Sequence, residues 1–253
     1  MVNTDMSGKV ALVTGGSRGL GLAVVGELRR RGAHVVALAR DAARLADAVA
    51  PLGDGVLGLQ GDIANPDDVR RVFREIERHF GRLDFLVNNA AVAQPYAVDQ
   101  LPDEEIASEI GVNFAGAVYT VRAAVPLMRV AGAGVIVNVS SESTQEPLIG
   151  MALYAATKAA LESFTLALNG ELRDDRIVAT LLRVGRMKDT GFSKSWAPGQ
   201  KERAVQSWSH DERWSKAGGP TETACVAEVL VGALALPPAA QLRLIDLREY
   251  GAR

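Results

Sequence analysis

Short apolar runs alternate with amphipathic stretches of helical length along the whole chain. Apolar runs of about four to eight residues bounded by turn residues predict buried strands, whereas apolar positions spaced three and four apart predict helices. The predicted strands are residues 10–14, 34–39, 56–60, 83–88, 134–140, 177–182 and 242–247. The predicted helices are residues 21–31, 42–50, 66–80, 102–128, 152–173 and 221–236.

This alternation predicts an α/β fold of the doubly wound type. Strands that alternate with helices form a parallel sheet, here of about seven strands, with helices on both faces. We find no internal boundary, repeat or low-complexity segment, so the prediction is a single domain over residues 1–253.

Residues 185–219 interrupt the alternation. The segment carries Phe192 and all three tryptophans, Trp196, Trp208 and Trp214, and contains no clear strand. A long connection after the carboxyl end of a strand is where a parallel sheet places a cover over its ligand, so we expect a substrate lid. The alternative is a pair of surface helices whose tryptophans cover the core.

A glycine-rich turn follows the first predicted strand. Gly15, Gly19 and Gly21 lie between that strand and a helical pattern. Glycines let the backbone turn tightly and approach a ligand closely, and the helix N-terminus offers free N–H groups to a phosphate. The stretch therefore predicts a dinucleotide phosphate site, although a turn of this kind can also serve packing alone.

Composition narrows the function classes. Of the 253 residues, 48% are hydrophobic and 23% are charged, and the formal charge is −2, so neither a nucleic-acid surface nor a polybasic membrane patch is indicated. No apolar run approaches the ~20 residues of a membrane span, and no signal peptide is visible, so we expect a cytoplasmic protein without membrane partners. One cysteine (Cys225) and three scattered histidines (His34, His79 and His210) predict no metal site.

Three residues have the character of a proton-transfer site. Ser141 follows the predicted strand 134–140, and Lys158 lies four residues after Tyr154, so the phenol and the ammonium share one helix face. A neighbouring cation lowers the pKa of a tyrosine, which suits Tyr154 to general acid/base work. Alone, such a pair is usually solvated.

The motifs together resemble those of the classical short-chain dehydrogenase/reductase family. They are the sequence TGGSRGLG at 14–21, Asp62-Ile63, Asn88-Asn89-Ala90, Asn113, Ser141, and Tyr154 with Lys158, in the family's order and spacing over about residues 7–185. The resemblance implies a Rossmann-type fold and a catalytic tetrad of Asn113, Ser141, Tyr154 and Lys158. In it, Tyr154 exchanges a proton with the substrate oxygen, Ser141 orients that oxygen, Lys158 binds the nicotinamide ribose, and Asn113 holds a water.

The resemblance also implies the cofactor contacts. Asp62 and Ile63 would bracket the adenine, while Asn88, Asn89 and Ala90 would border the adenosine ribose, each of these being open to a plain packing role. The full set of cofactor-binding candidates is Gly15, Ser17, Arg18, Gly19, Leu20, Gly21, Arg40, Asp62, Ile63, Asn89, Ala90, Tyr154, Lys158, Val184, Gly185, Met187 and Thr190.

The second strand bears on the choice of nicotinamide cofactor. NAD sites place an acid at the end of this strand, but this chain has Ala39 followed by Arg40, and Arg18 lies in the glycine turn. Guanidinium groups suit a 2′-phosphate. NADP(H) is therefore favoured over NAD(H), although Asp41 could partly neutralise Arg40.

Some positions depart from the family pattern. Ala91 replaces a usual glycine, Val184 replaces a proline before Gly185, and the expected threonine is one position late at Thr190. Val184, Met187 and Thr190 are the candidates for the nicotinamide carboxamide. The resemblance further implies a homotetramer or homodimer formed through helices 102–128 and 152–173.

The predicted function is reversible, NADP(H)-dependent interconversion of a carbonyl and a secondary alcohol on a small molecule. Two alternatives remain: a non-catalytic dinucleotide sensor, and an epimerase or dehydratase that uses the same cofactor. Glu142 and Glu146 could meet a cationic or hydroxylated substrate, or could be solvated loop acids. The sequence does not name the substrate.

Overall fold

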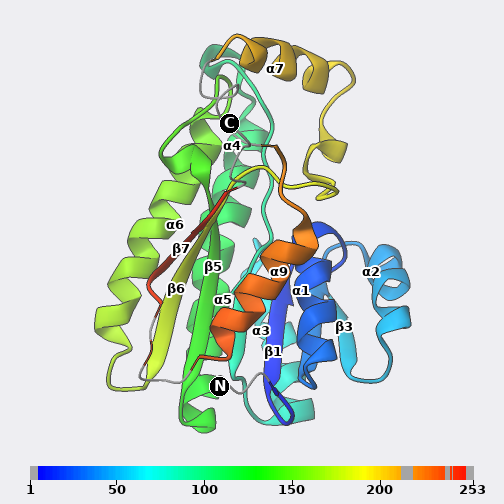
Figure 1. Ribbon diagram of the computed structural model, residues 1–253, viewed down its shortest axis with the longest axis vertical. Helices are drawn as coiled ribbons and strands as arrows, with labels where there is room; N and C mark the ends of the chain where they lie inside the picture. The colour runs from blue at the N-terminus through cyan, green and yellow to red at the C-terminus, as the bar shows by residue number, and fades with distance from the viewer. Residues whose placement is uncertain (1–4, 212–218, 237–239, 241, 249–253) are drawn as a thin grey trace.

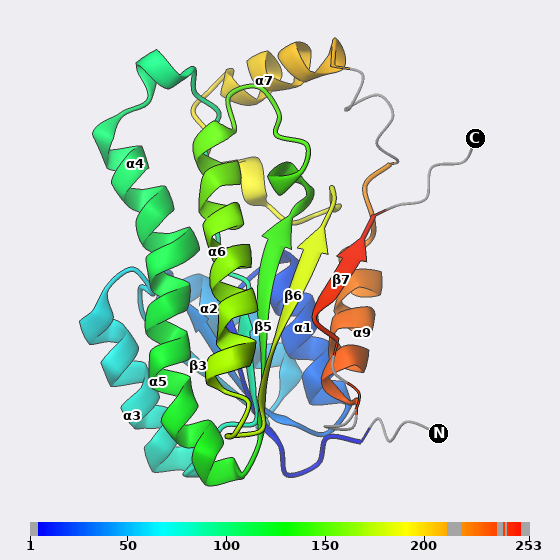
Figure 2. The ribbon, with the colours of Figure 1, turned by 90° about the vertical axis from the view of Figure 1, so that its left-hand side faces the viewer.

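The computed structural model describes residues 5–211, 219–236, 240 and 242–248. Within these residues, seven parallel strands form one sheet in the order β3-β2-β1-β4-β5-β6-β7 (Figures 1 and 2). The strands are β1 (Val10–Thr14), β2 (His34–Ala39), β3 (Val56–Gln60), β4 (Phe85–Asn88), β5 (Gly134–Ser141), β6 (Ile177–Val184) and β7 (Leu244–Leu247). The α/β prediction is confirmed.

Helices cover both faces of the sheet (Figure 2). One layer contains α1 (Gly19–Arg30), α2 (Ala42–Val49) and α9 (Thr223–Leu234), and the other contains α3 (Pro66–Phe80), α4 (Asp103–Ile110), α5 (Gly116–Ala131) and α6 (Ala152–Glu171). A further helix, α7 (Gln200–Ser209), lies beyond the carboxyl ends of the strands.

The interior strand β1 shows why both faces need helices. All five residues of β1 are buried. Because side chains alternate along a strand, Ala11 and Val13 enter the hydrophobic core beneath α1 and α9, while Val10 and Leu12 enter the core beneath α3 and α5. A strand that is apolar on both sides therefore lies in the interior of the sheet, and the carboxyl end of β1 is held between β2 and β4.

The position of the site follows from the strand order. The chain leaves β1 for β2 and β3 and then returns to β4 on the other side of β1. Connections diverge at this point, so a crevice opens at the carboxyl ends of β1 and β4, where ligands of parallel sheets bind.

Most predicted elements form close to their predicted bounds, and one does not. Strands 10–14, 34–39 and 56–60 and helix 66–80 match exactly. The helix predicted over 102–128 is interrupted at Gly111–Ala115 by a π-helical turn that separates α4 from α5. This turn contains Asn113, one of the predicted catalytic residues.

The α4–α5 stretch also corrects an expectation about membranes. Asp103–Ala131 is long and apolar enough to cross a bilayer by length and composition alone, so the expectation that no segment reaches that length was wrong. In this fold its apolar residues, including Val121, Ala124 and Met128, pack into the core against the sheet. A buried core helix passes the same test.

Candidate active site

The crevice is a cavity of about 850 Å³ along the carboxyl ends of the strands. Most of the predicted site residues line it: Gly15, Ser17, Arg18, Leu20, Arg40, Asp62, Ile63, Asn89, Ala90, Ser141, Tyr154, Lys158, Val184, Gly185, Met187 and Thr190. Three predicted residues do not line it, namely Gly19, Gly21 and Asn113. Residues from almost the whole length of the chain are thus brought to one edge of the sheet.

The two glycines behind the cavity wall have packing roles. A Cβ on Gly21 would lie 2.2 Å from the carbonyl oxygen of Gly15, and a Cβ on Gly19 would lie 2.7 Å from that of Thr190. Real Cβ atoms do not approach backbone this closely, so both positions require glycine for close contact. Gly21 lets α1 pack on the turn, and Gly19 lets the 190 segment pack against the start of α1.

Thr14 joins the ends of β1 and β4 beneath the cavity. Its hydroxyl accepts hydrogen bonds from the backbone N–H groups of Asn89 (3.0 Å) and Ala90 (3.1 Å), and its carbonyl accepts one from the Asn89 side-chain amide (3.0 Å). The two residues are therefore fixed at the cavity edge. Asn88, by contrast, is buried and bonded to Asn138 and Thr120, which is a packing role.

A cluster of guanidinium groups marks one end of the cavity. Arg18, Arg40 and Arg44 all line it, and Arg44 was not among the residues that we predicted. Burial lowers the pKa of Arg18, with further lowering from the charges of Arg44 and Arg40. The acids nearby are Asp62, 3.9 Å from Arg40, and Asp41, 3.2 Å from Arg44. This end of the cavity is suited to bind an anion.

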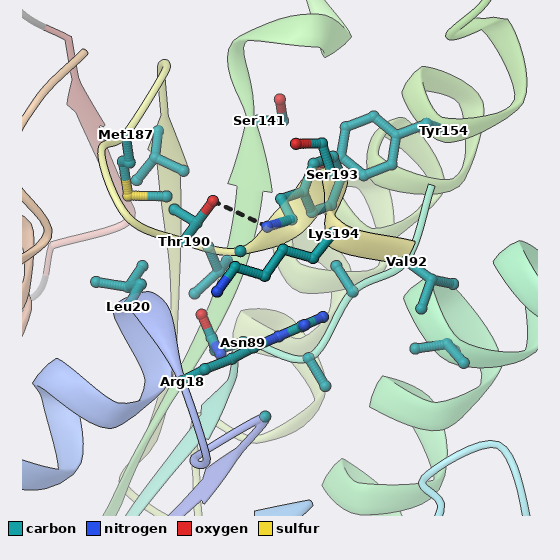
Figure 3. Close-up of a pocket in the computed structure, with 18 of the residues that line it drawn as sticks. Arg18, Leu20, Asn89, Val92, Ser141, Tyr154, Met187, Thr190, Ser193 and Lys194 are labelled. Carbon is teal, nitrogen blue, oxygen red and sulfur yellow. Dashed lines mark hydrogen bonds between the residues drawn. The ribbon is translucent and has the colours of Figure 1, made fainter. Parts of the chain in front are cut away.

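Ser141, Tyr154 and Lys158 meet at the other end, as predicted (Figure 3 labels the first two). Ser141 ends β5, while Tyr154 and Lys158 lie one turn apart on α6. The Ser141 side chain acts on the Tyr154 phenol and lowers its pKa. The ammonium of Lys158 lies 5.8 Å from the centre of the Tyr154 ring and donates to the carbonyl of Val139 at 2.8 Å.

The electrostatics of this pair correct one expectation. Burial raises the pKa of the Tyr154 phenol to about 12, against a smaller lowering by the Ser141 hydrogen bond. Burial also lowers the pKa of the Lys158 ammonium to about 8. We expected the lysine charge to lower the tyrosine pKa, but burial outweighs the lowering and the net shift is upward.

Asn113 supports the site from behind. The π-helical turn directs its side chain to Val92, where Oδ1 accepts from the backbone N–H at 2.9 Å and Nδ2 donates to the carbonyl at 2.8 Å. Nδ2 also donates to the Thr157 hydroxyl at 3.1 Å. The side chain thus ties the segment after β4 to α6.

Residues 185–219 cover the catalytic end of the cavity in the part that the structure describes. The segment includes a 3₁₀ turn, Phe192–Ser195, and α7, whereas Trp214 lies outside the described residues. Phe192 packs edge-on against Tyr154, with ring centres 5.5 Å apart. The indole N–H of Trp196 donates to the carbonyl of Ala93 (2.7 Å), and that of Trp208 to the carbonyl of Ile149 (2.8 Å).

These contacts bear on the two interpretations of the segment. Trp208 and the partly buried Trp196 belong to a small cluster with Ala93, Met151 and Tyr154, apart from the two cores beneath the sheet. Trp196 and Trp208 therefore lie over the site and not in the main cores, and their role as a substrate lid stays a prediction. We call residues 185–211 the lid from here on.

A known protein family has a sequence model that matches most of this chain. The short chain dehydrogenase family matches residues 9–201. This chain belongs to that family. The 11-beta-hydroxysteroid dehydrogenase 1A of Arabidopsis thaliana is 33% identical over 233 residues, which are 90% of this chain but 66% of the plant protein. The 3-oxoacyl-(acyl-carrier-protein) reductase of Homo sapiens is 33% identical over 177 residues, which are 70% of this chain and 75% of the human protein.

Solved short-chain dehydrogenase structures are also similar. The closed form of serine dehydrogenase complexed with NADP+ has a TM-score of 0.84 and 26% identity, covering 95% of this chain and 94% of that one. L-Sorbose reductase from Gluconobacter frateurii, complexed with NADPH and L-sorbose, has a TM-score of 0.84 and 27% identity, covering 97% of both chains. The Rossmann-type fold is thereby confirmed.

Sequence reasoning missed several residues of this short-chain dehydrogenase site. Arg44 lies four residues after Arg40, in the first turn of α2, and the sequence analysis considered only Arg40 and Asp41 there. Lys194 lines the cavity from the lid, where no local pattern distinguishes it from a surface lysine. Glu142 proves to be half-buried, and burial raises its pKa, so it is not a solvated loop acid.

Proposed function

We propose that this protein catalyses the NADP(H)-dependent interconversion of a carbonyl and a secondary alcohol. The observation that carries the proposal is one cavity lined by Ser141, Tyr154 and Lys158 at one end and by a cluster of arginines at the other. NADP(H) has a matching arrangement, with a phosphorylated ribose at one end and the reactive nicotinamide ring at the other.

The residues at the anionic end fit NADP(H) in particular. Arg18, Arg40 and Arg44 would hold the 2′-phosphate, and the glycine turn with the N-terminus of α1 would hold the diphosphate. The first turn of α1 carries no acidic residue that would repel an anion. The similarity to short-chain dehydrogenases complexed with NADP+ and NADPH supports the same choice.

At the reactive end, bound NADPH would supply the hydride, and the protein would supply the proton. Tyr154 holds its proton at neutral pH and would donate it to the substrate oxygen as the hydride arrives. Ser141 would donate a hydrogen bond to the same oxygen. Lys158 would bind the nicotinamide ribose, and a water on the main chain of Asn113 would pass protons from solvent.

The lid would give the site its substrate preference and exclude water. Phe192, Trp196 and Trp208 present aromatic surface to the cavity, and Glu142 lies beside Ser141. This combination favours a substrate with an apolar body and a polar group near the reactive carbon. It does not distinguish ketones, sugars, acyl thioesters and steroids.

The test is a screen of those four carbonyl classes with the purified protein and NADPH. We expect consumption of NADPH in one class, with formation of the matching alcohol in equal amount. Binding of NADPH without turnover in any class would favour a dinucleotide sensor. A product with inverted configuration or lost water, and no net change of NADPH, would favour an epimerase or dehydratase.

We also propose that the protein is a homodimer or homotetramer. Ile110 on α4 and Leu166 on α6 are 44% and 57% exposed, on helices that contact each other. Exposed apolar residues on adjoining helices suit an interface with a second copy. Light scattering of the purified protein would measure the mass directly, and a monomer would contradict the proposal.

A further inference from the structure

Lys194 is a lid residue that extends into the cofactor end of the cavity. It belongs to the 3₁₀ turn Phe192–Ser195 and lines the cavity. In Figure 3 its side chain runs from the lid across the cavity towards Leu20 and Asn89, and thus towards the glycine turn and the start of α1. An exposed lysine would otherwise extend into solvent, so this direction calls for an explanation.

A second cation approaches the same point from the other side. The Cδ atoms of Lys194 and Arg18 both lie 3.4 Å from the position that a Cβ on Gly191 would occupy. Arg18 belongs to the glycine turn and Lys194 to the lid, so the two charges come from segments far apart in the sequence. Burial of Arg18 further reduces the solvation that its charge receives.

No acid among the described residues forms an ion pair with either group. The carboxylates that line the cavity are Asp41, Asp62, Glu142, Glu146 and Asp189. Asp41 and Asp62 pair with Arg44 and Arg40, and Glu146 pairs with Arg248. Neither cation thus has an acidic partner among the described residues, and an anion that reached both would supply the counter-charge.

The anion can be identified from the position of the lid backbone. Thr190 packs directly on Gly19, the first residue of α1, because its carbonyl lies 2.7 Å from the position of a Cβ there. This contact places the lid beside the free N–H groups of the helix N-terminus, where a diphosphate binds. Arg40 and Arg44, in contrast, follow β2, where the 2′-phosphate of the proposed cofactor would lie.

We propose that Lys194 binds the diphosphate of the dinucleotide from the lid. The inference rests on the proposed function and extends it to a residue of the lid. The diphosphate would be held from three sides, by Arg18, by the N-terminus of α1 and by Lys194. Because the diphosphate is common to NADP and NAD, Lys194 contributes to the affinity for both and does not discriminate between them.

The test measures binding, by calorimetry, of NADP+, NAD+ and adenosine 2′-monophosphate, which lacks the diphosphate. We expect Lys194→Met to weaken the binding of NADP+ and of NAD+ by the same factor, about tenfold for the loss of one charge-assisted hydrogen bond. The affinity for adenosine 2′-monophosphate should stay unchanged. Lys194→Arg should retain most of the affinity. Added salt should reduce the difference in dinucleotide affinity between Lys194→Met and the unaltered protein, because salt screens the charge of Lys194.

Lys201→Met is the matched control, because Lys201 also lines the cavity from the lid, on α7. An equal loss of affinity in both variants would show that the effect comes from net charge alone and would overturn the assignment. A loss for NADP+ and adenosine 2′-monophosphate but not for NAD+ would assign Lys194 to the 2′-phosphate and also overturn it. If the unaltered protein binds NADP+ and Lys194→Met binds it equally well, only this inference fails, whereas failure of the unaltered protein to bind any dinucleotide refutes the proposed function with it.

Discussion

Burial, more than sequence spacing, determines the properties of individual residues in this site. Tyr154 and Lys158 occur at the spacing that places them on one helix face, and the structure confirms that placement. The sequence does not reveal how deeply they are buried. Desolvation favours the neutral form of each, so it raises the pKa of Tyr154 and lowers that of Lys158. A spacing pattern therefore predicts which residues meet but not their charge states.

Arg44 is the cofactor residue that the structure adds. We expect Arg44→Ala to weaken NADPH binding about tenfold, the worth of one charge-assisted hydrogen bond, and to leave NADH binding nearly unchanged. Arg40→Ala should act in the same direction. Calorimetric titration with both cofactors measures this, and Arg70→Ala, which removes an exposed arginine paired with Asp67 on α3, is the control. An equal loss for NADPH and NADH would contradict the 2′-phosphate assignment.

Glu109 makes the stability depend on pH. It is buried on α4, where Oε1 accepts from the backbone of Gln94 and Oε2 has no partner among the described residues. Burial raises its pKa to about 7, with a further contribution from Glu105. Between the ordinary value near 4.5 and 7 the folded protein binds more protons than the unfolded chain, so this group lowers stability as pH rises through that range.

Glu109→Gln should remove this dependence. At pH 8 the variant should be more stable than the unaltered protein by up to about 3 kcal/mol, and near pH 4 the two should be alike. Thermal unfolding across this pH range measures the difference. Glu104→Gln, an exposed acid on the same helix, should change nothing. Equal stabilities at pH 8 would show that Glu109 is not perturbed.

At the scale of elements, the glycine turn and the lid form one unit. Gly19 has φ +53°, and a Cβ there would meet the backbone of Thr190. Gly19→Ala should therefore displace the lid, lower the melting temperature and weaken dinucleotide binding at least tenfold. Gly26→Ala, inside α1 with open space around it, should instead raise stability by about 0.5–1 kcal/mol. If both variants behave alike, the lid does not pack on the turn.

The hydrophobic pattern predicts elements well where burial is continuous and poorly where side-chain bonds decide. β1, β2 and α3 form as predicted because apolar runs and a helix cap at Asn65 mark their ends. The interruption at Asn113 could not be predicted, because it depends on hydrogen bonds to Val92, a residue distant in the sequence. The lid was recognised from its tryptophans, but its contact with Gly19 was not.

For the whole molecule, the strand order explains how weak local signals form one site. Because β1 lies between β2 and β4, the glycine turn, the arginines after β2 and the Asn89 segment meet at one crevice. β5 and α6 bring Ser141 and Tyr154 to the same edge. The motifs predicted this arrangement in outline. The approach of Arg18 and Lys194 to Gly191 could not be predicted, because it depends on how the folded lid lies over the glycine turn.

The central claim is that Tyr154 transfers a proton while the rest of the site binds the dinucleotide. The most direct measurement is single-turnover reduction of the best carbonyl substrate from the screen by Tyr154→Phe, together with its affinity for NADP+. Tyr119→Phe, in which the altered ring lies against Arg122 on α5, is the control. We predict that Tyr154→Phe loses at least about a hundredfold in rate and retains NADP+ affinity within about twofold. A rate equal to that of the unaltered protein would contradict the account.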